Sequence, residues 1–194
     1  MRLPGTLALS LLAWLAGAAE PPRLLPPEVQ IAAAVAPLPE EFRPGATVLG
    51  YREGSKDLVT LREGSGAFVC LSDNPSDDRF HTACYHRSLE PFMARGRALR
   101  SAGEKEVDRI RNAEIEAGRL DMPRHPAALY SLTGPLTTLD PATGTVTGAK
   151  PLYVIYVPFA TGESTGLPTK PKENLPWLMN PGTPKAHIMF TPSM

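Results

Sequence analysis

The fold is decided by the stretch Leu152-Tyr153-Val154-Ile155-Tyr156-Val157, because every residue in it is β-branched, aromatic or leucine. β-Branched and aromatic side chains favour the pleated backbone of a strand. Successive strand residues point to opposite faces of a sheet, and here both faces are apolar. A strand that is apolar on both faces is typical of the interior of a sheet. We therefore expect this stretch to be a central strand.

Further strand signals precede and follow it. The candidate strands are Ala46–Tyr51, Leu58–Arg62, Ala67–Leu71, Arg79–Tyr85 and Ala186–Phe190. Glu53-Gly54-Ser55-Lys56 and Gly64-Ser65-Gly66 separate the first three, and such short polar segments are typical of turns. Because antiparallel strands need only short connections, an antiparallel meander is the expected arrangement.

Helical patterns lie between these strands. Ser88 can cap a helix whose apolar residues recur at helical spacing: Leu89, Phe92, Met93, Gly96 and Leu99. Ser101 and Glu104 have the spacing of a capping box for a second helix. Its predicted apolar line is Val107, Ile110, Ala113, Ala117 and Leu120. Together the patterns predict an α+β fold, a mainly antiparallel β-sheet with two amphipathic helices on one side.

The N-terminus has the features of an export signal. Arg2 is followed by an apolar run from Leu7 to Leu15, and Ala16-Gly17-Ala18 forms a small-residue cleavage site. We expect residues 1–19 to be a cleavable signal peptide and residues 20–45 to be a Pro-rich lead-in with a short helix. Residues 46–194 then form a single α+β domain. No other stretch is long enough to span a membrane, so a periplasmic or extracellular location is expected.

The charge content disfavours one class of partner, nucleic acid, and the two cysteines predict a disulfide. The 194 residues carry 20 basic and 20 acidic side chains, without the basic stripe that nucleic-acid binding requires. Cys70 and Cys84 would meet an oxidising compartment after export, where a disulfide forms. The bridge would close a loop of about 15 residues and stabilise the fold by about 3 kcal/mol.

Several motifs occur in a fixed order along the chain. They are Gly45-Ala46-Thr47-Val48-Leu49, Leu61-Arg62-Glu63-Gly64, Phe68-Val69-Cys70, Cys84, Tyr130-Ser131-Leu132-Thr133-Gly134 and His187-Ile188-Met189. This order resembles that of a group of uncharacterised exported bacterial proteins, from about residue 28 to the C-terminus. In that group a proline directly precedes the histidine of the last motif, whereas here Lys185-Ala186 separates Pro184 from His187. The resemblance implies export and a paired-cysteine domain, and it implies no activity.

One cluster has the composition of a metal site. Asp77, Asp78, His81, Cys84 and His86 lie close in sequence, and His187 can join them from the last strand. Such side chains are the ligands of zinc or copper. Against a site, a disulfide would occupy Cys84, and an ordinary strand would direct His81 and His86 to opposite faces. The alternative function is a metal-binding protein or metal-dependent enzyme that uses His81, His86 and His187, and it requires these three side chains to converge.

Other catalytic patterns are weak. The chain has no G-x-S-x-G elbow and no phosphate-binding glycine loop, and its helical carboxylates suit a solvated face. We therefore lean towards a non-catalytic domain that binds a small ligand or an envelope partner. The Gly162–Pro184 loop with Trp177 is the expected contact element, because function concentrates on loops over a rigid scaffold. Trp177 and Tyr130 are the predicted ligand- or partner-contact residues. Tyr130, Tyr153, Tyr156 and Trp177 can together line a groove, although packing in the core with the hydroxyls at its rim is the favoured interpretation.

Overall fold

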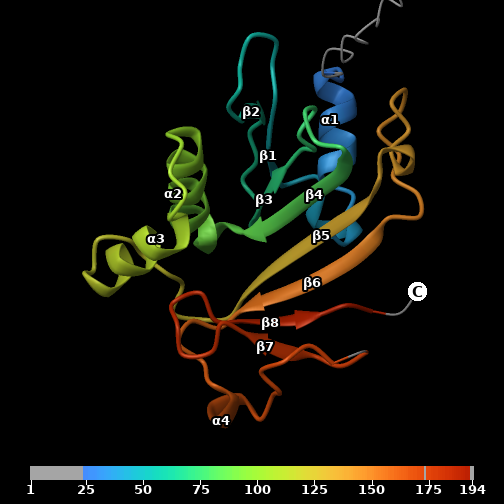
Figure 1. Ribbon diagram of the computed structural model, residues 1–194. Helices are drawn as coiled ribbons and strands as arrows, with labels where there is room; N and C mark the ends of the chain where they lie inside the picture. The colour runs from blue at the N-terminus through green and yellow to red at the C-terminus, as the bar shows by residue number, and fades with distance from the viewer. Residues whose placement is uncertain (1–23, 173, 193–194) are drawn as a thin grey trace, which may run out of the picture.

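A computed structural model describes residues 24–172 and 174–192 of the chain (Figure 1). Its centre is one eight-stranded sheet with the order β2-β1-β3-β4-β5-β6-β8-β7. The strands are β1 (Thr47–Gly50), β2 (Val59–Arg62), β3 (Phe68–Leu71), β4 (Arg79–His86), β5 (Ala127–Pro135), β6 (Lys150–Tyr156), β7 (Trp177–Met179) and β8 (His187–Phe190). All pairs are antiparallel except β1 and β3. The predicted α+β class with a mainly antiparallel sheet is confirmed.

The expected meander is wrong at its third strand. β3 does not follow β2 in the sheet but returns to the other side of β1, where the two strands run parallel. The Gly64–Gly66 segment makes this return possible by passing close to the chain before β1. The Gly66 amide donates to the Gly45 carbonyl at 2.8 Å, and a Cβ on Gly64 would lie 2.3 Å from the same oxygen. Glycine is therefore required by close backbone approach.

Helices cover both faces of the sheet. We call the two faces the α1 face, which carries Phe68 and Tyr130, and the α2 face, which carries Val69 and Val154. α1 (Pro27–Ala34) packs on the first through a buried cluster. α2 (Glu90–Ser101) and α3 (Val107–Glu116) lie on the second. In Figure 1, α1 and the α2–α3 pair stand on opposite sides of β1, β3 and β4. The predicted helix pair is present, with α1 across the sheet from it.

The lead-in helix is part of the core. Ala34, Val35 and Leu38 are at most 9% exposed and pack against Val48 and Phe68. The remaining helices are short: the 3-10 turns η1 (Glu40–Phe42), η2 (Arg87–Leu89) and η3 (Leu136–Thr138), and the helix α4 (Gly162–Thr165). The lead-in and the strands thus share one hydrophobic cluster.

The packing of α3 differs from the predicted apolar line. Ser101 ends α2 instead of capping α3, and Ala113 and Ala117 are exposed. The buried residue is Arg111, at 3% exposure. Its guanidinium lies 3.8 Å from the centre of the Phe92 ring and donates to an Asp108 carboxylate oxygen at 2.6 Å. A cation over an aromatic ring and a charged partner offset its desolvation.

The Cys70–Cys84 disulfide is present, between directly opposed residues of β3 and β4. Both cysteines are fully buried on the α1 face. Among residues 24–172 and 174–192, every helix falls short of the length and apolar character that a bilayer crossing requires.

Candidate functional site

A row of aromatic side chains crosses the α1 face of the sheet. Register places Tyr130 of β5 opposite Tyr153 of β6, and Tyr153 opposite Phe190 of β8. The Phe68 and Tyr130 rings are 5.8 Å apart, and the Tyr130 and Tyr153 rings are 5.7 Å apart. Phe42 of η1 extends the row, with its ring 5.1 Å from Phe68. The row links strands that are far apart in sequence.

This row is covered only around Phe68, since Phe42 beyond it is 40% exposed. Phe68 is 5% exposed because α1 and η1 pack over it, whereas Tyr153 is 40% and Phe190 is 38% exposed. Ile155, which lies on the same face of β6, is 43% exposed. We call the part under α1 the covered half-face; its residues are Val48, Phe68, Cys70 and Cys84. We call the part on β6 and β8 the outer half-face; its residues are Tyr153, Ile155, Ile188 and Phe190. An apolar area left exposed in this way marks an interaction site more often than a packing defect.

A groove lies where the two half-faces meet. Its wall is the turn after α1, residues 36–39, and its floor comes from β5, β6 and the chain before β6. The lining residues are Ala36, Pro37, Leu38, Pro39, Arg43, Tyr130, Leu132, Ala149, Pro151 and Tyr153. The space over this groove is ≈ 420 Å³ and is open to solvent, so the groove is shallow rather than an enclosed cavity.

Arg43 holds the wall of this groove in place. Its guanidinium donates through Nε to the Leu38 carbonyl at 2.8 Å and through Nη2 to the Ala36 carbonyl at 3.2 Å. These bonds satisfy two carbonyls in the proline-rich turn, where α1 has already ended. Within the described residues, no hydrogen bond engages the third guanidinium nitrogen, Nη1.

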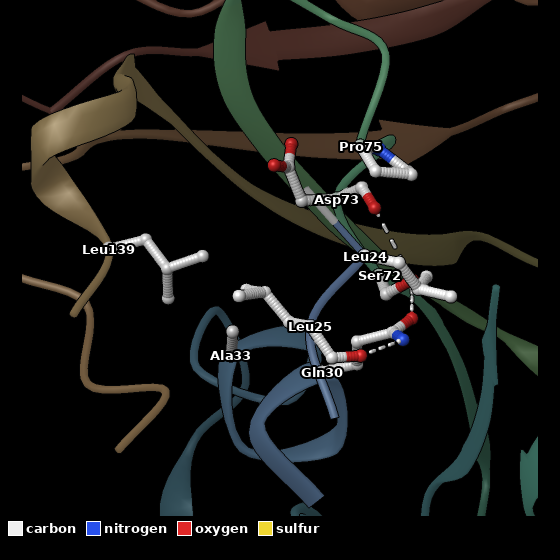
Figure 2. A pocket seen from close by; sticks show the side chains of 8 residues that line it. All are labelled: Leu24, Leu25, Gln30, Ala33, Ser72, Asp73, Pro75 and Leu139. Carbon is white, nitrogen blue, oxygen red and sulfur yellow. Dashed lines mark hydrogen bonds between the residues drawn. The ribbon is translucent and has the colours of Figure 1, made fainter. Parts of the chain in front are cut away.

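A second, smaller pocket lies at the other end of α1 (Figure 2). Gln30 is 6% exposed, and its amide donates to the carbonyls of Leu25 at 2.7 Å and Tyr51 at 2.9 Å. The amide oxygen accepts from the Tyr51 N–H at 2.9 Å and the Ser72 hydroxyl at 3.1 Å. Two of these bonds join α1 to Tyr51 after β1, and a third joins it to Ser72 after β3.

The same pocket contains an acid of altered pKa. Burial, with a smaller contribution from Asp77, raises the pKa of Asp73 to about 6, although its carboxylate accepts from the His81 backbone N–H. In Figure 2 this carboxylate points away from Gln30 and Ser72. The enclosed space is ≈ 20 Å³, which holds about one water molecule. The hydrogen bonds of Gln30 beside this pocket hold α1 on the sheet, and the pocket is too small for any ligand larger than a water molecule.

The three candidate metal ligands do not converge. His81 bonds to the Thr133 hydroxyl at 2.9 Å, His86 to the Ser88 hydroxyl at 2.8 Å, and the His187 ring to the Lys185 carbonyl at 2.7 Å. His81 and His86 lie on opposite faces of β4, as strand alternation predicts. Strand pairing aligns His81 with Thr133 of β5. It aligns His187 with Tyr156 of β6, which in turn pairs with Ala127 of β5. Six residues of strand separate Thr133 from Ala127, roughly 20 Å.

No other side chains complete a metal site. In the part of the chain that the structure describes, no three His, Cys, Asp or Glu side chains gather to hold a metal ion. Burial lowers the pKa of both His81 and His187. The convergence that the metal hypothesis requires is therefore not found.

Trp177 and Tyr130 occupy different surfaces. Trp177 is half-buried at the start of β7, and its partner on β8 is Met189. Met189 in turn pairs with Val154, which places Trp177 on the α2 face, across the sheet from Tyr130. The Gly162–Pro184 loop also contains α4 and β7, with the Leu178 N–H bonded to the Pro168 carbonyl at 2.8 Å. It is a structured segment rather than an open loop, and one contact surface cannot use both residues.

The main groove residues had only partial signals in the sequence. Tyr130 and Tyr153 were visible as groove candidates, but nothing indicated that Tyr153 would be uncovered while Tyr156 is buried. Pro37, Pro39 and Arg43 lay in the lead-in and carried no functional motif. Their role depends on where α1 docks, which no local pattern reports.

Comparison of the chain with models of known protein families, with curated proteins and with solved structures found no match. A function has therefore to be argued from the surface itself.

Proposed function

We propose that this chain is an exported, non-catalytic binding domain whose contact surface is the groove beside α1 together with the outer half-face. The observation that carries this proposal is the exposure of Tyr153, Ile155 and Phe190 in one continuous area. Isolated apolar residues on a surface need no explanation, but aligned ones at the mouth of a groove are typical of a contact site.

The chemistry of the groove supports binding rather than catalysis. Its described lining contains neither a histidine nor a carboxylate, and the only nucleophilic groups are the hydroxyls of Tyr130 and Tyr153. General acid–base catalysis needs a group whose pKa lies near the operating pH. The perturbed carboxyl, Asp73, lies in the small pocket at the opposite end of α1. The groove thus offers shape and apolar surface without a catalytic pair.

Export is supported by the N-terminal signal pattern and by the buried disulfide. The expected product is a mature chain that starts near residue 19, in a periplasmic or extracellular fraction, with Cys70 and Cys84 joined. Intact mass measurement of fractionated cells tests this. Recovery of the full-length chain from the cytoplasm alone would contradict export.

The binding proposal is tested by site-specific photocrosslinking in cells that export the protein. A photoreactive phenylalanine analogue replaces Tyr153 in one variant and Ile155 in another. A matched control carries the analogue at Arg119, which is exposed after α3 on the α2 side. We expect a discrete adduct from positions 153 and 155 and none from 119. Adducts of equal yield at all three positions, or at none, would overturn the proposed contact surface.

A further inference from the structure

The shape of the groove favours an extended occupant. One wall is the turn at residues 36–39, the opposite side opens onto the outer half-face, and the floor follows Tyr130, Pro151 and Tyr153. Beyond β8 the face closes again, because Leu178 of β7 is fully buried. The accessible apolar area therefore runs from the groove beside α1 across β6 to β8 and stops at β7, where Leu178 is buried.

The polar groups of the groove are suited to a ligand rich in acceptors. Tyr130 and Tyr153 carry hydroxyls that can donate as well as accept, and the Arg43 guanidinium only donates. Proline contributes a carbonyl acceptor and no N–H donor. An extended proline-rich segment exposes these carbonyls, because a polyproline helix has no internal hydrogen bonds. Grooves lined with aromatic side chains dock such segments at a low entropic cost.

The charge of the lining adds a second element of complementarity. Arg43 is the one charged residue among the described lining residues, and the free Nη1 leaves it able to donate to an anion. A carboxylate next to the prolines would pair with it, and hydrogen bonds between charged groups are stronger than neutral ones. We propose that the groove binds an extended, proline-rich peptide segment of a partner protein that carries an acidic residue. This inference rests on the proposed binding function and names its ligand class.

Two other occupants fit the surface less well. The Tyr130 and Tyr153 rings meet at 68°, so they do not form the coplanar platform on which a sugar ring would stack, and the described lining has no amide or carboxylate for sugar hydroxyls. A second copy of the chain is disfavoured by area. Tyr153, Ile155 and Phe190 are each about two-fifths exposed. A fully buried aromatic side chain covers about 150–250 Å², so the two exposed rings and the smaller Ile155 together offer roughly 200 Å². A standard interface buries about 800 Å² on each partner.

Fluorescence anisotropy with three labelled peptides tests the ligand class on the mature, disulfide-bonded protein. The first is a run of prolines ending in glutamate, the second is the same run ending in lysine, and the third is a glycine–serine peptide of equal length ending in glutamate. We expect the first to bind, the second to bind about tenfold more weakly through the lost pairing with Arg43, and the third not to bind. Changing the peptide instead of Arg43 avoids disturbing the turn that Arg43 holds.

A pair of variants locates the site. Tyr153→Ala should weaken binding of the acidic proline peptide by about tenfold, as expected for one aromatic anchor. Phe159→Ala is the matched control, because Phe159 is 54% exposed and lies outside the groove. Both variants should keep the fold, which circular dichroism and thermal unfolding check.

The outcomes separate the ligand class from the binding function. Equal binding of all three peptides, or an equal loss in both variants, would overturn the inference. Binding of a linear glucan with no peptide binding would replace it with a saccharide site, and a concentration-dependent dimer in sedimentation would replace it with a second copy. Adducts at Tyr153 without binding of any proline peptide would leave the binding function standing and remove only the peptide class.

Discussion

The two half-faces of the α1 face are both apolar, but one is buried and the other is exposed. Both are lines of apolar side chains on neighbouring strands, and one row of aromatic rings runs through them. Phe68 in the covered half-face is 5% exposed, whereas Phe190 in the outer half-face is 38% exposed. The difference comes from the path of the chain: α1 and η1 pack over β1, β3 and β4, whereas the chain after β6 goes to the sheet edge. Apolar alternation therefore predicts which residues share a face, and the connections decide whether that face is buried.

Truncation of a covered ring and of an exposed ring of the aromatic row should give the largest contrast. Phe68→Ala removes a buried ring that contacts Phe42, His86 and Tyr130. We expect a loss of about 4 kcal/mol in the free energy of unfolding, because the protein cannot fully close the cavity. Phe190→Ala, at the exposed end, should lose about 1 kcal/mol or less. Urea denaturation measures both. Equal losses would mean that the two half-faces are buried alike in solution.

The attachment of α1 is what makes the covered half-face, and Gln30 tests it. Gln30→Leu keeps a similar volume but leaves the Tyr51 N–H and the carbonyls of Tyr51 and Leu25 without their partner. We expect a loss of about 2 kcal/mol, since unsatisfied buried groups are costly. Amide hydrogen exchange should rise in α1 before it rises in β5. The exposed change Glu28→Gln on the same helix serves as the control, and unchanged exchange in α1 would assign its docking to apolar contacts alone.

Asp73, beside the same attachment, predicts a pH dependence. Burial raises its pKa from 3.8 to about 6 in the folded state, so between these values the folded chain binds more protons than the unfolded chain. Stability from this group is therefore present below about pH 4 and falls as the pH rises towards 6. Asp73→Asn should stabilise the protein at pH 7 by about 1 kcal/mol, discounted from the linkage value because the carboxyl is partly exposed.

The control for this change is Asp78→Asn, which removes the same charge at an exposed position. Denaturation at pH 4 and pH 7 gives the comparison. The benefit of Asp73→Asn should disappear at pH 4, while any effect of Asp78→Asn should be smaller at pH 7. A benefit that is the same at both pH values would rule out titration of Asp73 as its cause.

The strongly patterned elements were predictable from sequence, and contacts between distant segments were not. Residues 152–156 of the predicted stretch lie in the interior strand β6, the residues from Glu90 to Ser101 form a helix, and Cys70 and Cys84 are joined. These features follow from local periodicity or from covalent chemistry. The parallel β1–β3 pair was missed because short turns favour a meander, and only the close passage of Gly64 and Gly66 against Gly45 allows the return.

The candidate site shows the same division. Tyr130 was a predicted contact residue and lines the groove, whereas Arg43 was missed because its partners are the backbone carbonyls of a turn. Arg111 lies outside the apolar line predicted for its helix, but it is buried over Phe92. The charge of a side chain indicates a solvated face only when no ring and no carboxylate lie within reach. Those partners belong to tertiary structure.

The smallest expected effect is the sharpest test of the outer half-face. Ile155 and Val154 are neighbours on β6, but Ile155 is 43% exposed and Val154 is 6% exposed on the other face. Val154→Thr buries a hydroxyl among apolar side chains and should cost about 2 kcal/mol. Ile155→Thr places its hydroxyl in water and should change the free energy of unfolding by no more than about 0.5 kcal/mol. Because the strand and the introduced residue are the same and the two positions are adjacent, the difference chiefly reports the two faces. If Ile155→Thr cost as much as Val154→Thr, the outer half-face would have to be covered in solution, and an unfolding midpoint that rises with protein concentration would identify a second copy as the cover.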